Sequence, residues 1–312
     1  MTGNLDGPAA ERFGFELTLF RFALAPLPAS EPRDPSAWRT DQVFIGHFAV
    51  TDVARQKFHF AERYARASVG LAGARVRPLR VWLENWSLVS MEDSSSAWRI
   101  RASADDIELE LALMSLKAPV LNGQRGLSVK ADEPGHATYY YSLPRLHAEG
   151  TLRIDDTVFP VSGLSWLDRE WASSVLSSEQ QGWDWFAVQL SDGSDLMFYS
   201  LRKLDGSQDT HSAGTWVDRQ GYSTPLGAED VTIEVLAYWD SPLGGRYPAA
   251  WRILCPLLDL DLQLEPVFKD QELNTTPRYW EGAVDVTGKK GGVVIDGRGY
   301  VELTGYASEL GR

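Results

Sequence analysis

The chain has 312 residues, of which 44% are hydrophobic and 23% are charged. These values are typical of globular proteins, and no apolar run approaches the ~18 residues of a membrane span, so disordered, collagen-like and membrane-spanning proteins are excluded. The 30 Lys and Arg residues stand against 43 Asp and Glu residues. The resulting net charge of -13 repels phosphate backbones, so we expect no nucleic-acid partner.

The N-terminal residues 3–8, Gly-Asn-Leu-Asp-Gly-Pro, have the composition of a turn. The alternation in 13–24 predicts that a strand follows this turn, and together they predict a hairpin whose other arm comes from ahead of Met1 or from elsewhere. No secretory signal begins the chain as given, because a basic stretch followed by an apolar stretch is missing. The single cysteine, Cys255, cannot form an internal disulfide.

Alternation of apolar and polar residues with a period of two dominates the chain and predicts a β protein. The clearest cases are 107–113, 231–235 and 260–265. Irregular loops are predicted at 25–40 and 118–138. The other predicted strands are 13–24, 42–51, 57–66, 80–89, 97–104, 139–143, 147–154, 157–163, 184–190, 195–202, 213–217, 250–254, 279–287 and 299–306.

Many short strands without long amphipathic helices are typical of antiparallel barrels or sandwiches. About 17 strands suffice for two barrels of about eight strands each, the size at which one barrel holds one small ligand. We therefore predict an all-β fold of two antiparallel barrels in tandem. The 12 Trp, 11 Tyr and 12 Phe residues suit pleated surfaces and pockets for apolar ligands.

Sequence motifs for metals and cofactors are missing. The five histidines have neither HxxxH nor HxH spacing, and no cysteine pair lies beside them, so no metal site is expected. The chain also lacks the GxSxG, GxGxxG and GxxxxGK[ST] motifs, so serine-hydrolase, dinucleotide-binding and P-loop functions lose their usual sequence support. No cofactor is expected.

The densest group of chemically active residues lies at 163–171. On an extended segment Trp166, Asp168 and Glu170 project to one face, with α-carbons of successive members about 6.6 Å apart. A desolvated carboxyl pair beside an indole can hold a proton at neutral pH and act as a general acid. The favoured alternative is that Asp168 or Glu170 pairs with Arg169 or another arginine and stabilises a barrel rim.

Aromatic residues form two further groups. Trp183 and Trp185 share one face of a predicted hairpin, and an indole pair is more often barrel core than a ligand clamp. Tyr139 and Tyr141 share a face and can offer hydroxyls to a cavity, whereas packing is the simpler role for Tyr140.

His47 is a polar residue in an apolar segment. A hydrogen-bonded core histidine is favoured there over a proton-transfer group.

These segments together resemble the lipocalin-like family that includes carotenoid 1,2-hydratase, also called hydroxyneurosporene synthase, and the AttH-type predicted secreted hydrolases. The resemblance is to the AttH-type branch and extends from residue 2 to about residue 202. The matching segments are 2–5 (Thr-Gly-Asn-Leu), 13–15, 20–24, 47–52, 139–142, 166–171 (Trp-Leu-Asp-Arg-Glu-Trp) and 182–186 (Gly-Trp-Asp-Trp-Phe).

The resemblance implies two lipocalin-like barrels and a hydrophobic ligand. We expect 1–175 to form a hydratase-type barrel that lacks its first strand, and 176–312 to form the second barrel. In the hydratase branch, water is added across an isoprenoid double bond and an aspartate protonates the alkene. By motif position Asp168 is that aspartate and Trp166 replaces a hydratase aromatic residue.

Some positions depart from the hydratase pattern. Residues 168–171 are Asp-Arg-Glu-Trp where hydratases have an Asp-His-Asn-Trp type of sequence, and Tyr139 and Tyr141 fall near a hydratase histidine and aromatic residue. Family members carry a Glu-Trp-Trp-containing strand ahead of the segment that matches 2–5, which corresponds to the missing hairpin arm. AttH-type members are usually exported, so the resemblance implies a periplasmic, secreted or lipid-anchored full-length protein, with membrane-transporter components as partners.

Three functions follow from the residues and the resemblance. The first is an enzyme that hydrates an isoprenoid- or lipid-like ligand, with Asp168 as general acid and Glu170 or Tyr141 positioning water. The second is a non-catalytic carrier linked to an export system, and the third is a secreted hydrolase, since a protonated carboxyl beside a carboxylate can assist attack of water on an ester or glycoside. The predicted ligand-binding residues are Trp166, Tyr139, His47, Trp171, Trp183 and Trp185.

Overall fold

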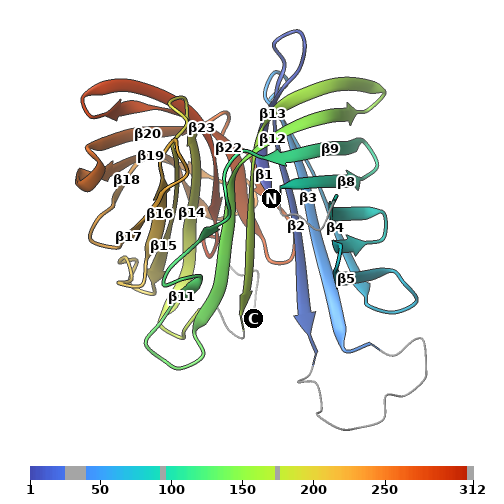
Figure 1. Ribbon diagram of the computed structural model, residues 1–312, viewed down its shortest axis with the longest axis horizontal. Coiled ribbons are helices and arrows are strands. Elements are labelled where there is room, and N and C mark those ends of the chain that lie inside the picture. Colours follow the sequence, from blue (N-terminus) through green and yellow to red (C-terminus); the bar gives the residue numbers. More distant parts are fainter. Residues whose placement is uncertain (25–39, 92–95, 173–175, 308–312) are drawn as a thin grey trace.

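The structure, a computed structural model, describes residues 1–24, 40–91, 96–172 and 176–307. In this part of the chain a 13-stranded and a 10-stranded antiparallel sheet curl side by side into one nearly closed barrel and one half-barrel (Figure 1). The predicted all-β fold with two lipocalin-like barrels is confirmed. No helix among these residues has the length and apolar character needed to cross a membrane.

The first sheet has the strand order β4-β3-β2-β1-β13-β12-β9-β8-β7-β6-β5, and β10 and β11 pair with β12. Strand β6 also contacts β2, β3 and β4, so the two ends of the sheet approach each other. The strands are β1 (Thr2–Asp6), β2 (Arg12–Ala23), β3 (Gln42–Asp52), β4 (Lys57–Arg66), β5 (Ala72–Val76), β6 (Leu79–Leu83), β7 (Trp86–Ser90), β8 (Ala97–Ser103), β9 (Ile107–Ser115), β10 (Val120–Leu121), β11 (Leu127–Val129), β12 (Ala137–Ile154) and β13 (Thr157–Ala172).

The second sheet has the order β17-β16-β15-β14-β23-β22-β20-β19-β18, and β21 pairs with β22. A short 3-10 helix, η1 (Pro256–Leu258), joins β19 to β20. The strands are β14 (Gln180–Leu190), β15 (Asp195–Lys203), β16 (Ala213–Val217), β17 (Ser223–Gly227), β18 (Thr232–Asp240), β19 (Arg246–Cys255), β20 (Leu260–Pro266), β21 (Glu272–Leu273), β22 (Tyr279–Lys290) and β23 (Val293–Leu303).

The N-terminal segment differs from its prediction. Residues 2–6 form strand β1, which pairs with β2 on one side and with β13 on the other, and the turn begins only after Asp6. Gly3 serves close packing here, since a Cβ at this position would lie 2.4 Å from the Phe15 ring and 2.8 Å from the carbonyl oxygen of Leu164. Gly3, one of the residues that suggested a turn, is therefore needed for the close approach of β1 to β2 and β13.

Gly3→Ala is expected to lower the free energy of unfolding by about 1–3 kcal/mol, because the new methyl group meets the buried Phe15 ring and the backbone of Leu164, neither of which can move freely. Urea unfolding measures the change. Gly7→Ala is the matched control, since its methyl group would meet the flexible side chain of Glu11. Equal losses in both variants would contradict a packing role for Gly3.

Other strand boundaries also differ. The predicted strand 80–89 is the hairpin β6–β7, which turns at Glu84 with a left-handed φ of 55°. The predicted strands 139–143 and 147–154 form one strand, β12, with a register shift between Leu143 and Leu146. The predicted loop 118–138 contains β10 and β11. Most of the predicted loop 25–40, residues 25–39, lies outside the described residues.

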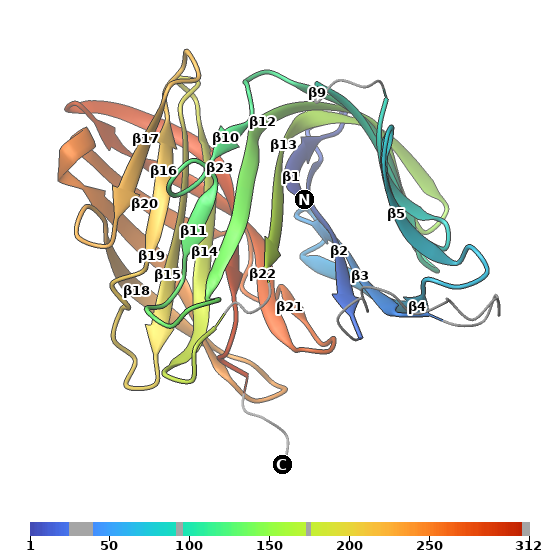
Figure 2. The same ribbon diagram turned by 60° about the horizontal axis from the view of Figure 1, so that its bottom comes forward.

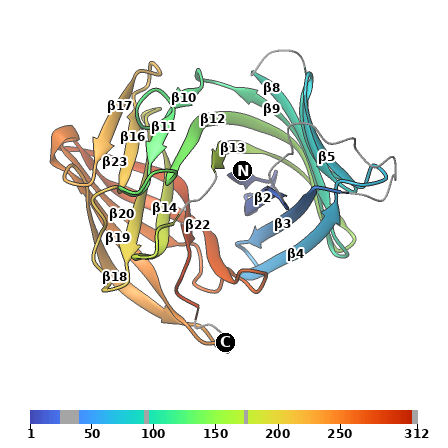
Figure 3. The ribbon, with the colours of Figure 1, turned by 90° about the horizontal axis from the view of Figure 1, so that it is seen from below.

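Alternate side chains of β13 and β14 fill the interiors of their own barrels. In β13, Leu167 belongs to the first core, while Trp166 points to the other face. In β14, Phe186 belongs to the second core, while Trp185 points to the other face. The outer faces of β12 and β13 therefore meet those of β14 and β15 between the barrels, an arrangement that Figures 2 and 3 show from below.

A buried ion cluster joins the two sheets at this interface. Asp195 of β15 is fully buried, and its carboxylate lies 2.7 Å from Lys117 Nζ and 2.8 Å from the Arg145 guanidinium. Lys117 also donates to the carbonyl oxygens of Gly193 and Asp218. Burial raises the pKa of Asp195, whereas both cations lower it. The carboxylate therefore depends on these partners to stay charged.

Candidate active site

The pairing of β12 with β13 determines which side chains surround Asp168. Ser142 is directly opposite Asp168, and Tyr140 is opposite Glu170, so these side chains share the face between the barrels. Tyr140 Oη donates to Oδ2 of Asp168 at 2.5 Å, and Ser142 Oγ donates to Oδ1 at 2.5 Å. Trp166 Nε1 also donates to Oδ1, at 2.7 Å. Asp168 is half-buried, whereas its three partners are buried.

These partners determine where Asp168 can hold a proton. Burial raises the pKa of Asp168, and its three hydrogen-bond donors oppose that rise. An indole N–H can only donate, so Trp166 keeps Oδ1 as an acceptor. A hydroxyl both donates and accepts, so Tyr140 can reverse its hydrogen bond. The proton of a neutral Asp168 therefore lies on Oδ2, directed at Tyr140 Oη.

The second barrel completes the site. Trp185 Nε1 of β14 donates to Tyr140 Oη at 3.1 Å, and the Trp166 and Trp185 rings meet edge to face, with centroids 6.4 Å apart. Asn122 donates to Ser142 Oγ at 2.9 Å and is itself held by a threonine hydroxyl on β16. The site therefore exists only where the two barrels meet.

Glu170 shares the face of Asp168, as predicted, but has partners of its own. Its Oε1 accepts a hydrogen bond from Thr138 at 2.6 Å and lies 3.4 Å from Lys130 Nζ. Lys130 is buried and lies over the Tyr199 ring, 3.3 Å from its centroid. The cation that neutralises Glu170 is thus a lysine from the predicted loop and not Arg169.

Tyr139, Tyr141 and Trp171 lie on the opposite face of β12 and β13. The rings of Tyr139 and Trp171 stack with centroids 5.9 Å apart, and Arg169 donates to Tyr141 Oη at 3.1 Å. Because neighbouring strand residues alternate between faces, the sheet separates these side chains from Asp168. The structure therefore does not bring Tyr141 to the position of a water-orienting group.

His47 and Trp183 lie farther along the interface. His47 is buried, with Nδ1 2.8 Å from Tyr279 Oη and Nε2 3.1 Å from Glu62 Oε1, so it is a hydrogen-bonded histidine at the contact of the barrels. Trp183 Nε1 donates to Glu302 at 2.7 Å. Burial raises the pKa of Glu302 to about 7, so this carboxyl titrates near neutrality.

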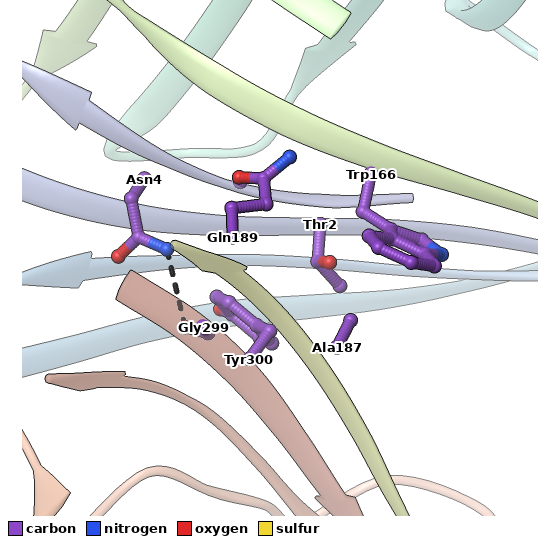
Figure 4. A pocket seen from close by; sticks show the side chains of 8 residues that line it. Thr2, Asn4, Trp166, Ala187, Gln189, Gly299 and Tyr300 are labelled. Carbon is purple, nitrogen blue, oxygen red and sulfur yellow. Dashed lines mark hydrogen bonds between the residues drawn. The ribbon is translucent and has the colours of Figure 1, made fainter. Parts of the chain in front are cut away.

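A small cavity lies between the sheets beside Trp166 (Figure 4). Its volume of about 10 Å³ corresponds to one water molecule, so an apolar ligand does not fit there. Asn4 donates to the carbonyl of Gly299 across this cavity. The residues that line it are Thr2, Gly3, Asn4, Trp166, Ala187, Gln189, Gly299 and Tyr300.

Sequence reasoning missed four residues of this region: Tyr140, Ser142, Lys130 and Glu302. Tyr140 and Ser142 have the same parity along β12, and the register with β13 would have assigned both to the face of Asp168. No local pattern indicated Lys130 or Glu302, because their partners are distant in the chain. Within the described residues, no group of three or more His, Cys, Asp or Glu side chains is placed to hold a metal ion.

Comparisons with known proteins place this geometry in context. A family model described as AttH-like matches residues 1–306, while no curated protein matches. A candidate AttH protein from Nitrosomonas europaea is 34% identical, with a TM-score of 0.85 over 98% of this chain and 91% of that one. Kievitone hydratase from Nectria haematococca is 15% identical, with a TM-score of 0.76 over 98% and 88%. CghA is 13% identical, with a TM-score of 0.54 over 100% and 88%, and these last two show the fold alone.

Proposed function

The chain belongs to the AttH-like family, and we propose that it is a hydratase-type enzyme that adds water to a carbon–carbon double bond of an apolar, isoprenoid- or lipid-like substrate. The observation that carries this proposal is the Asp168 carboxyl, which can hold a proton at Oδ2 beside two indole rings. The likeness of the fold to kievitone hydratase supports the reaction class.

The proposed reaction begins when the proton on Asp168 Oδ2 leaves its hydrogen bond to Tyr140 Oη and is transferred to one alkene carbon. A C–H bond forms and the other carbon becomes cationic, where the rings of Trp166 and Trp185 favour positive charge. Hydrogen bonds to an ionised carboxylate are stronger than those to a neutral carboxyl. The donors on Asp168 therefore stabilise the state in which the proton has left, and this lowers the barrier to transfer. Water then attacks the cation, forms the C–O bond and loses a proton.

We place the substrate at the partly exposed end of the interface. Trp183, Trp185 and Asp168 are all half-buried there, whereas the water-sized cavity beyond Trp166 leaves no room for an apolar molecule. Half-buried indoles suit an apolar substrate because they combine apolar surface with one polar N–H.

Incubation of the protein with a mixed lipid and isoprenoid extract in heavy-oxygen water tests this function, and a protein-free incubation is the control. Mass spectrometry is expected to find products that have gained one labelled water. A pair of fragments, one of which carries the label, would instead identify a hydrolase. An apolar ligand that stays bound without label would identify a carrier.

A further inference from the structure

Three glutamates approach one another between the barrels, next to the Asp168 site. Glu281 of β22 is directly opposite Glu302 of β23, and Glu302 is directly opposite Trp185 of β14. Glu16 reaches the same space from β2 of the first barrel, and Glu16 and Glu281 are 0% and 3% exposed. Carboxyls so close and so buried cannot all carry charge, so at least one of them retains a proton at neutral pH.

The surroundings of Glu281 identify it as the residue that retains the proton. Burial, followed by the charges of Glu16 and Glu302, raises its pKa well above the usual range. Glu16 Oε2 is buried and finds no donor elsewhere among the described residues, and a neutral Glu281 supplies one. The titratable and charged groups that face Glu281 are Glu16, Glu302, Tyr279, Tyr300 and the α-amino group of Met1.

A row of hydrogen bonds leads from Glu16 to solvent. Tyr279 Oη donates to Glu16 Oε1 at 3.1 Å and lies 2.8 Å from Nδ1 of His47. His47 Nε2 lies 3.1 Å from Oε1 of Glu62, whose side chain is 21% exposed. Each member can both accept and release a proton, and imidazole can take a proton at one nitrogen while it releases another. The row therefore consists of groups that can relay a proton.

Glu281 and Glu302 continue from Glu16 toward the proposed reaction centre, since Glu281 interacts with Glu16 and is directly opposite Glu302. Trp185, the cross-strand partner of Glu302, donates to Tyr140, which in turn donates to Asp168. The charge of Glu170 raises the pKa of both Tyr140 and Glu302, so both groups lie near enough to Glu170 to respond to its charge. Glu302 is half-buried, and its Oε1 accepts a hydrogen bond from Trp183, one of the indoles beside which we place the substrate.

We propose that Glu302 accepts the proton of the attacking water and that the row passes this proton to solvent at Glu62. The proposal rests on the hydration reaction above. In order, the path consists of Glu302, Glu281, Glu16, Tyr279, His47 and Glu62.

The protons balance over one turnover. Asp168 loses a proton to the alkene carbon, and the water that forms the C–O bond loses a proton to the Glu302 carboxylate. The path then delivers one proton to solvent, and Asp168 takes one from solvent. The net change is the addition of one water to the substrate, with the enzyme restored.

Infrared spectroscopy at pH 7 tests the path without any substrate. The wild type is expected to show the carbonyl absorption of neutral carboxylic acids, and Glu281→Gln is expected to lose the part of it that Glu281 contributes, while any contribution of Asp168 and Glu302 remains. Tyr279→Phe, which removes one hydroxyl from the row, is expected to shift this absorption. Tyr247→Phe is the matched control, because its buried hydroxyl binds Glu272 in the second barrel. A wild type without the neutral-acid absorption would overturn the proposal.

Turnover in the full-length chain supplies the second readout. Glu302→Gln is expected to lower turnover by about 100-fold, as for loss of a general base. Tyr279→Phe is expected to lower it by about tenfold, with recovery when imidazole buffer carries the proton. Wild-type turnover in Tyr279→Phe would overturn the path. If the wild type hydrates no substrate but shows a neutral-acid absorption that Glu281→Gln removes, the hydration reaction fails while the proton path stands.

Discussion

Asp168→Asn is expected to lower turnover by about 10²- to 10⁴-fold while the protein stays folded, the range typical of a lost general acid or base. The amide oxygen of asparagine can still accept the hydrogen bonds of Trp166 and Ser142. The amide nitrogen that replaces Oδ2 carries no proton that can be transferred to an alkene. Initial rates of labelled-water incorporation measure the loss, and thermal unfolding checks that the fold is kept.

Asp156→Asn is the matched control for this prediction. Asp156 lies exposed in the turn that joins β12 to β13, at the far end of these strands from Asp168. Its replacement is expected to leave both turnover and thermal unfolding unchanged. Wild-type turnover in the position 168 variant would show that another group supplies the proton.

Asp195→Ala is expected to lower the free energy of unfolding by about 3–5 kcal/mol, the cost typical of removing one partner from a buried ion cluster. The reason is the charge that stays behind. Lys117 and Arg145 are only 5% and 12% exposed, so neither ammonium nor guanidinium can regain its hydration without movement of the sheets. Urea unfolding at pH 7 measures the difference.

Asp261→Ala provides the comparison with a surface ion pair. Asp261 accepts two hydrogen bonds of 2.9 Å from Arg252, and both side chains are almost half exposed. Solvent screens such a pair, so its loss is expected to cost about 1 kcal/mol or less. Similar losses of unfolding free energy in both variants would show that burial does not increase the contribution of the Asp195 cluster to stability.

Most strands were predictable because alternation is a local property of the sequence. The segment 107–113 lies within β9, as its alternation predicted. The errors occur where a contact between distant residues decides the conformation. Residues 2–6 form a strand because Gly3 fits against Phe15 and β13, and no pattern within the first residues of the chain contains that information.

The candidate site was predictable only in part, for a related reason. Alternation correctly assigned Trp166, Asp168 and Glu170 to one face. The choice between Tyr140 and Tyr141 as the neighbour of Asp168 depends on the register of two long strands, which alternation alone does not determine. The second barrel's Trp185 could be placed beside Asp168 only once the two barrels were docked.

The assignment of each barrel's inner face to core packing has a consequence for protein engineering. In β13 and β14, residues of one parity hold a barrel together, while residues of the other parity form the interface with the reactive groups. Barrel packing and the residues of the proposed site are thereby encoded at alternating positions of the same strands. Variant libraries restricted to the interface parity, such as Trp183, Trp185 and Ala187, are expected to change selectivity while the cores stay intact.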